Sequence, residues 1–474
     1  MDRILITIVL LTTLIFWLIR NKDNLTYSKL AEILIAFYIF SCAFPRLFLP
    51  LYTLNYPFHW GTFDIAFRIQ IYLLLIPFFL LIISKRFNWK VQPIKKKYIL
   101  IILLFIGYTM LNPYDTVKDA TLIPVVYLLA YLVFLYLLYS TCTIKTIIKG
   151  IYLGFAITIA LHFVLAILFP VMNISSAITL FSYDATIRAI SRAGAVGTFS
   201  HPNSLGVYAS YYLMFFLSCV LIKFRTKDSI LLSICAFIII VLTGSRSALI
   251  SGVVGLMAMI CLYIYRQYQI FSPKIFFKGV IPVVIIATIL LFFTPISKLF
   301  FNSDMDEMAL ARIMHYICGF EIFKEHPLIG VGLNSHLKYL NDNIDIDFQL
   351  LFSTDEWLGK DFMYSDPIHN MWIVILTEMG LIGLLAIAFY IGRFIFLFKK
   401  RIAASNSIFY NISLITTLGI ICCLLVQGNS DWAPLTPTSL NISLLFFFIS
   451  AQSNDSKIND YNTSDNISCC HNKL

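Results

Sequence analysis

Long apolar stretches recur along nearly the whole chain and are separated by short polar connections. Each stretch is about 17–25 residues long, which is what a helix needs to cross about 30 Å of hydrocarbon. The pattern predicts spans over residues 4–19, 30–48, 65–84, 98–112, 122–140, 147–171, 204–222, 229–243, 247–265, 279–294, 369–398, 408–426 and 435–450. We therefore expect an all-α polytopic integral membrane protein with about 12–13 transmembrane helices.

The charges of the connections predict which side of the membrane each one faces. Basic clusters occupy alternate connections, among them residues 85–97 and 223–227, and such clusters face the cytoplasm. The long segment 295–368 falls on the other side and holds 12 of the 25 acidic residues but only five basic ones. It is the expected large periplasmic loop, with short helices of its own.

Five regions follow from this topology. They are amino-terminal membrane helices (1–171), central helices with arginine-bearing periplasmic loops (172–294), the large periplasmic loop (295–368), carboxy-terminal helices (369–450) and a disordered cytoplasmic tail (451–474).

Composition excludes several classes of protein. With 59% hydrophobic and 13% charged residues, the chain has too much apolar surface for a soluble domain. The net charge of +10 would suggest a nucleic-acid partner, but the basic residues lie mainly in the predicted cytoplasmic connections, so we expect none. Only Cys318 of the ten cysteines falls in the large loop, which indicates neither a disulfide scaffold nor a zinc site.

Arginine is enriched on the predicted outer side. It outnumbers lysine there seven to five, whereas lysine outnumbers arginine 17 to 6 inside. A guanidinium group binds phosphate oxygens through a planar fork, so the outer arginines suggest an anionic ligand, although each could instead reach lipid headgroups or pair with a loop acid. The candidates are Arg46, Arg68, Arg188, Arg192, Arg246 and Arg312. The four-residue spacing of Arg188 and Arg192 would let both hold one diphosphate.

A helical pattern over residues 311–324 places four residues on one stripe, namely Arg312, His315, Tyr316 and Gly319. The alternative interpretation is a helix that lies on the membrane surface.

His369 is the candidate general base. On a continuous helix His369, Gly380 and Gly383 would share one face, and the glycines would let a neighbouring helix approach. The helix macrodipole would help to keep the imidazole neutral, as a base requires. The alternatives are an interfacial histidine bound to headgroups and, for Glu378 on the opposite face, a buried structural acid.

Four sequence blocks resemble the O-antigen ligase and polymerase superfamily. His369-Asn370, nine residues, Gly380, two residues and Gly383 looks like the histidine motif of O-antigen ligases. The blocks at 197–203 (GTFSHPN), 243–247 (TGSRS) and 312–332, which contains HPLIGVG, are similar to further family blocks. Together they cover roughly residues 190–390. The chain has His315-Tyr316 where the family commonly has an aromatic residue after the loop arginine.

The resemblance implies a helical fold whose periplasmic loop caps a cavity open to the membrane. It implies transfer of a glycan from undecaprenyl diphosphate without a metal or another cofactor. His369 would activate the acceptor hydroxyl, and the donor diphosphate would be held by Arg246 and Arg312 with Arg188 or Arg192. Possible accessory residues are His315, Asn370 and Arg68.

The expected partners are the lipid-linked donor, a sugar acceptor on lipid A core or on a growing glycan, and membrane lipids. The histidine motif favours a ligase of the inner membrane whose site faces the periplasm, with a repeat-unit polymerase as the close alternative. A flippase for lipid-linked sugars belongs to a different class, and neither a repeat nor a midplane charge chain supports it. A metal site at Asp345 and Asp347 for a nucleotide sugar fits poorly with their predicted external position.

Overall fold

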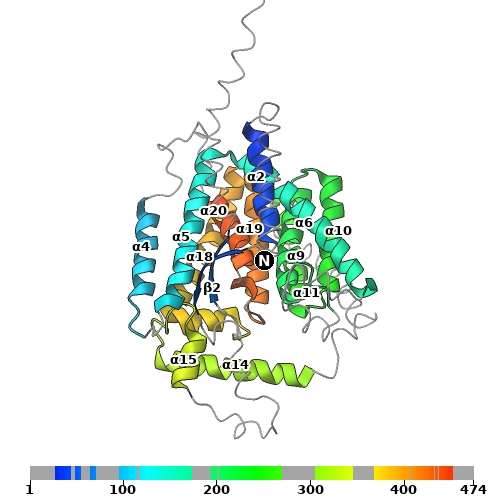
Figure 1. The fold of residues 1–474 in the computed structure, drawn as a ribbon. Coiled ribbons are helices and arrows are strands. Elements are labelled where there is room, and N and C mark those ends of the chain that lie inside the picture. Colours follow the sequence, from blue (N-terminus) through cyan, green and yellow to red (C-terminus); the bar gives the residue numbers. More distant parts are fainter. Residues whose placement is uncertain are drawn as a thin grey trace, which may run out of the picture.

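The structure is a computed structural model that describes residues 27–43, 48–54, 65–70, 96–114, 118–172, 194–199, 202–268, 305–344, 368–405, 407–431, 433–435 and 437–451. Figure 1 shows long helices side by side in a bundle, with α14 and α15 lying across one end. The helices are α2 (Tyr27–Cys42), α4 (Lys96–Met110), α5 (Lys118–Thr141), α6 (Ile144–Met172), α9 (Pro202–Leu221), α10 (Thr226–Leu242), α11 (Arg246–Tyr268), α14 (Met305–Glu325), α15 (His336–Asn343), α18 (Met371–Ala404), α19 (Ile408–Gln427), the 3-10 turn η1 (Ala433–Leu435) and α20 (Pro437–Ala451).

The architecture confirms the all-α polytopic membrane fold. Among the described residues, four segments are both long and apolar enough to cross a membrane: Ile144–Ile167, Pro202–Leu221, Met371–Phe398 and Ile408–Gln427. The helices α2, α4, α5, α10, α11 and α20 also fall on predicted spans. Within the predicted large loop, α15 is a short helix as expected, whereas α14 is longer, with 21 residues. The predicted spans 4–19 and 279–294 and the tail beyond residue 451 lie outside the described residues.

A small antiparallel hairpin departs from the expected helices. Strand β1 (Phe48–Leu54) pairs with β2 (Ile65–Gln70), and the register shifts between Pro50 and Tyr52. The prediction that a helix begins at residue 65 is therefore wrong for residues 65–70. The segment Ile-Ala-Phe-Arg-Ile-Gln alternates large apolar residues with small or polar ones, which is the two-residue period of a strand. Average hydropathy hides that alternation.

Helix α9 is the central helix of the bundle. It packs on α6, α10, α11 and α19, and nearly its whole length is buried. Large aromatic residues fill the core between α6 and α9, including Phe155, Tyr212 and Phe215. On the other side, a methyl group added at Gly206 would lie 2.6 Å from the Ala248 side chain, so small residues bring α9 and α11 together. The first turn of α9 is consequently held firmly in place.

Helix α18 is broken at Gly380, where the backbone is left-handed with φ 63°. The expectation of one continuous helical face through His369, Gly380 and Gly383 is wrong, because the helix begins only at Met371 and is interrupted nine residues later. At the break the HPLIGVG segment lies against the backbone, and an added methyl group at Gly380 would overlap the Leu328 carbonyl. The close neighbour of this glycine is thus a loop and not a helix.

The loop satisfies the backbone groups that the break releases. The amides of Val331 and Gly332 donate to the carbonyls of Thr377 and Glu378, at 2.9 and 3.0 Å. In the other direction, the amides of Leu381 and Ile382 donate to the carbonyls of residues 327 and 328, at 2.9 and 3.2 Å. Unpaired backbone groups are costly in a membrane, so loop and broken helix stabilise one another.

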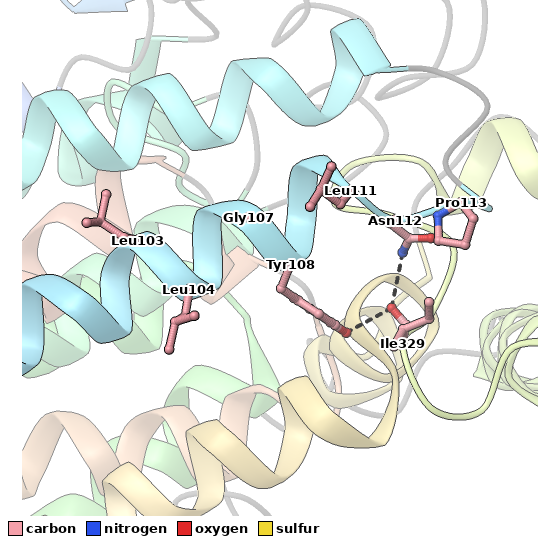
Figure 2. A pocket seen from close by; sticks show the side chains of 8 residues that line it. All are labelled: Leu103, Leu104, Gly107, Tyr108, Leu111, Asn112, Pro113 and Ile329. Atoms are coloured by element: carbon pink, nitrogen blue, oxygen red, sulfur yellow. Dashed lines mark hydrogen bonds between the residues drawn. The ribbon is translucent and has the colours of Figure 1, made fainter.

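Helix α4 closes the outside of this junction, as Figure 2 shows. The Tyr108 hydroxyl donates to the carbonyl of Ile329 at 2.9 Å, and the Asn112 side-chain amide donates to the carbonyls of Ile329 and Gly330 at 3.2 and 3.0 Å. A pocket of about 380 Å³ lies beside these contacts and is lined mainly by apolar residues of α4, including Leu103, Leu104 and Gly107. The polar atoms of Tyr108 and Asn112 are directed at the loop.

Candidate functional site

The turn that follows α19, Gly428 to Asp431, joins three of the elements that carry predicted site residues. The carbonyl of Gly428 accepts from the amide of Met371 at 2.8 Å, which attaches the start of α18. The carbonyl of Asn429 accepts from the Tyr316 hydroxyl at 3.0 Å, which attaches α14. The Asp431 carboxylate accepts from the Asn203 side-chain amide, which attaches the start of α9.

His369 lies directly above this turn and faces a carboxylate. Its Nδ1 is 3.9 Å from Oδ1 of Asp431; the histidine side chain is 27% exposed and the aspartate side chain 5%. This distance is longer than a hydrogen bond but within the range of an ion pair. A buried carboxylate next to a partly exposed imidazole stabilises the protonated ring and can orient it, which is the arrangement of a general base.

Asn370 caps the helix that follows His369. Its side-chain oxygen accepts from the amides of Trp372 and Ile373 at 2.9 and 3.1 Å, and its side-chain nitrogen donates to the carbonyl of Asn429 at 3.1 Å. The cap satisfies two of the free amides at the start of α18 and also binds the turn. Asn370 therefore fixes the backbone on which His369 stands.

His315 packs against His369 from α14. The two ring centroids are 5.3 Å apart, and the His315 side chain is fully buried. Burial, with a smaller effect of the nearby His369, His336 and Arg312, lowers the pKa of His315 to about 3. His315 is thus a neutral ring throughout the physiological pH range, packed beside the candidate base.

Arg246 and Arg312 are close enough for the positive charge of one to act on the other. Arg246 is the first residue of α11, immediately after a turn whose Gly244 has φ 65°. Arg312 lies exposed on α14, one helical turn before His315. Two guanidinium groups from separate elements thus lie within electrostatic reach of each other on the side of the bundle that carries His369.

Of the remaining predicted arginines, the structure describes only Arg68, and only its backbone. Arg188 and Arg192 lie outside the described residues. Arg68 lies in β2, opposite Pro50, and not on the expected helix.

The predicted stripe on α14 is confirmed in its contacts. His315 and Tyr316 reach His369 and the turn after α19, and a methyl group added at Gly319 would overlap Ile373 on α18. Glu378, expected as a buried structural acid, is indeed mostly buried and is paired, with Oε1 2.6 Å from Nδ1 of His336 on α15.

Three residues of this region were not identified from the sequence: Asn203, His336 and Asp431. A signal for Asp431 exists, because it is the only acidic residue between Lys400 and residue 451, where two apolar spans flank it. Asn203 ends the GTFSHPN block, but the block gives it no role, and His336 carries no comparable signal, because only the folded chain brings these residues to their partners. Among the residues that the structure describes, no three His, Cys, Asp or Glu side chains are grouped as metal ligands.

Comparison with protein families identifies the central part of the chain. Residues 231–388 match the model of the O-antigen ligase family, and this segment contains Arg246, Arg312, His315, His369 and Asn370. Asn203 and Asp431 lie outside it. A search of curated proteins gives no significant match. The match supports the resemblance of the sequence blocks to the O-antigen ligase superfamily, and the chain is a polytopic membrane protein with an O-antigen ligase segment over residues 231–388.

Proposed function

We propose that this protein transfers a glycan from undecaprenyl diphosphate to a hydroxyl group of an acceptor sugar, at the periplasmic face of the bacterial inner membrane. The observation that carries the proposal is the position of His369 between the buried carboxylate of Asp431 and the neutral ring of His315, on the side of the bundle where Arg246 and Arg312 meet. A base and an anion-binding pair are the two parts that such a transfer needs.

His369 is the general base in this proposal. It accepts the proton of the acceptor hydroxyl while that oxygen attacks the anomeric carbon of the donor sugar. The bond between the anomeric carbon and the diphosphate oxygen breaks, and undecaprenyl diphosphate leaves with its negative charge. Asp431 stabilises the imidazolium that forms. The two side chains are 3.9 Å apart here and come closer when substrate binds, because catalytic contacts are often long before the substrate is present.

Arg246 and Arg312 hold the donor diphosphate. Their mutual repulsion is relieved when an anion binds between them, and their planar forks match phosphate oxygens. The N-terminal ends of α9, α11 and α18 all lie on this side of the bundle, and their partial positive charges favour the same anion. Arg188 and Arg192 remain candidates for the same role. Since the leaving group is already good, the mechanism proposed here uses no metal ion.

The enzyme is a ligase in this proposal, because the segment matched to the O-antigen ligase family includes the histidine and both arginines. The polymerase is distinguished by its product. A ligase joins one glycan to each acceptor, whereas a polymerase produces a ladder of lengthening repeats on the lipid carrier.

The test is transfer by the purified protein in proteoliposomes. The donor is the lipid-linked glycan that accumulates in a strain lacking this protein, and the acceptor lipid comes from the same strain. His369→Ala should lower turnover by about 10²- to 10⁴-fold while donor affinity is retained, because the arginines bind the donor. Asp431→Asn should lower turnover by about 10²-fold or more, because an amide does not stabilise the imidazolium. Full turnover in both variants would contradict the proposal.

A further inference from the structure

The GTFSHPN block is the one sequence block that the proposed mechanism leaves without a role. Ala195, two positions before the block, and Thr198 within it are fixed by contacts to distant segments. The amide of Ala195 donates to the carbonyl of Leu242 at 2.8 Å, and the Thr198 hydroxyl donates to the carbonyl of Ala43. Since that hydroxyl has one proton, it accepts from His162, whose Nε2 is 2.8 Å away.

Residues 194–199, which lead into the block and begin it, are also tightly packed. Gly197 has φ 57°, and a methyl group added there would lie 3.0 Å from the His162 ring. Ala195, Thr198 and Phe199 are all buried. Three contacts from different parts of the bundle therefore hold the chain just before α9 begins.

Asn203 follows in the first turn of α9, directly after Pro202. Proline is suited to the first position of a helix because its φ is already helical and it lacks an amide proton. The rest of α9 is buried in the core of the bundle. The backbone of Asn203 is thus held by the central helix that it begins, and residues 194–199 are anchored a few positions before it.

The side chain of Asn203 reaches one oxygen of the Asp431 carboxylate. Its Nδ2 donates to Oδ2, whereas Oδ1 of the same carboxylate is the oxygen that faces Nδ1 of His369 at 3.9 Å. Rotation of a carboxylate about its last side-chain bond is a soft motion with a broad preference. A donor on one oxygen selects the rotation and so determines where the other oxygen lies.

We infer that Asn203 is a positioning residue of the transfer reaction, which holds the Asp431 carboxylate with one oxygen directed at His369. This inference rests on the proposed role of His369 as the base. Asn203 is a neutral donor, so it orients the carboxylate without adding a positive charge that would oppose the imidazolium. Among the other titratable or charged groups of this region, His315 on α14 packs against His369. Arg312 on α14 and His336 on α15 act electrostatically on His315, and Arg246 at the start of α11 lies within electrostatic reach of Arg312.

The inference predicts changes of opposite sign in the pH profile of turnover. In Asn203→Ala the Asp431 carboxylate loses the hydrogen bond that selects its rotation, so it stabilises the imidazolium that forms less well. The acid limb of the profile should then move to lower pH, and turnover should decrease about tenfold, the effect of one hydrogen bond. In Asn203→Asp the added negative charge beside Asp431 favours the imidazolium, so the acid limb should move to higher pH.

The experiment uses the full-length protein in the proteoliposome assay described above. Turnover, donor KM and the pH profile are measured for both Asn203 variants, and donor KM should stay unchanged. Asn411→Ala is the matched control. Asn411 is also a buried asparagine, bound to the carbonyl of Ser405 at 3.2 Å, but at the start of α19 and so at the other end of that helix from Asp431. It should leave the pH profile unchanged.

If His369→Ala and Asp431→Asn show lowered turnover as proposed, three results would overturn the inference about Asn203. They are an Asn203→Ala variant with normal turnover, a tenfold loss with no displacement of the acid limb, and a displacement of the same sign in both variants. If Asn203→Ala does not fold, Asn203→Asp alone decides, because an acid limb that stays in place or moves to lower pH contradicts the inference. Normal turnover of His369→Ala and Asp431→Asn would instead reject the proposed function itself.

Discussion

At the scale of single residues, the site combines a partly exposed base with groups that are buried for different reasons. His369 is accessible to a substrate, Asp431 is buried beside it, and His315 is fully buried and neutral. The two arginines come from separate elements, so their spacing depends on how α14 lies across the bundle.

The arginine pair is tested by a substitution that retains charge. Arg246→Lys and Arg312→Lys should each lower turnover by about 10- to 100-fold, which corresponds to the loss of about 1.5–3 kcal/mol from a charge-assisted hydrogen bond. A lysine cannot reproduce the planar fork. Donor KM should rise together with the loss of turnover, as measured in proteoliposomes. Near-normal kinetics in both variants would assign these arginines to lipid or to structure.

His315 should make the folded protein sensitive to acid. Its pKa is about 3 in the folded protein against an ordinary 6.5, so the unfolded state binds more protons between these values. Keeping His315 neutral costs the folded protein no stability above about pH 6.5, and the folded protein loses stability as the pH falls from 6.5 toward 3. At pH 5 the loss is about 2 kcal/mol.

His315→Phe keeps a ring in the same space but cannot be protonated. Its thermal unfolding midpoint in detergent should therefore fall less between pH 7 and pH 5 than that of the natural protein, whatever the difference at pH 7. Parallel decreases for the two proteins would show that His315 is not protonated on unfolding in this range.

At the scale of elements, the break in α18 is the feature that a sequence pattern predicts least well. The glycines at 380 and 383 are seen in the sequence, but helical periodicity places them on one face of an unbroken helix. The positive φ of Gly380 is stable only because backbone groups of the HPLIGVG segment take the place of the missing helical bonds. That pairing involves residues about 50 positions apart, and periodicity along a helix does not report such contacts.

Gly380→Ala should disrupt this junction. The new methyl group would overlap the Leu328 carbonyl, and the left-handed backbone would cost about 1–2 kcal/mol in addition. We expect a lower unfolding midpoint and a loss of turnover, because the loop also carries α14 and α15 to the site. Gly392→Ala on the same helix is the control, since nothing lies within 4 Å of its added methyl group. It should be neutral or slightly stabilising, and equal effects of the two substitutions would contradict the described break.

At the scale of the whole molecule, hydropathy predicted more than the residue patterns did, and the orientation that the charges predict stays a prediction. The membrane class and most of the described helices follow from the apolar stretches, because a bilayer requires each span to be long and continuous. His369, Arg246 and Arg312 were identified through their sequence blocks. The sequence did not indicate three residues, because the contact that shows the role of each joins positions far apart in the chain: Asn203, His336 and Asp431.

The predicted orientation can be tested with a pair of engineered cysteines in a background without reactive natural cysteines. Asn343→Cys lies on α15, and Lys227→Cys lies at the start of α10; both positions are exposed. The 20 residues of α9 separate Lys227 from the side of the bundle that carries the site, a helix length of about 30 Å.

In spheroplasts, a membrane-impermeant maleimide should label Asn343→Cys and should reach Lys227→Cys only after the membrane is opened. A cysteine at Lys90, in the predicted cytoplasmic connection 85–97, should behave like Lys227→Cys. Labelling of Lys227→Cys in intact spheroplasts, with Asn343→Cys protected, would reverse the orientation and move the proposed reaction to the cytoplasm.

The turn after α19 also has a consequence for engineering this protein. The segment that matches the O-antigen ligase family ends at residue 388, so a chimaera made by exchanging that segment alone would import a histidine and two arginines. Their carboxylate and its asparagine would still come from the host chain, at positions selected for a different partner. A functional exchange should therefore require residues 194–203 and 427–431 to be transplanted together with the matched segment.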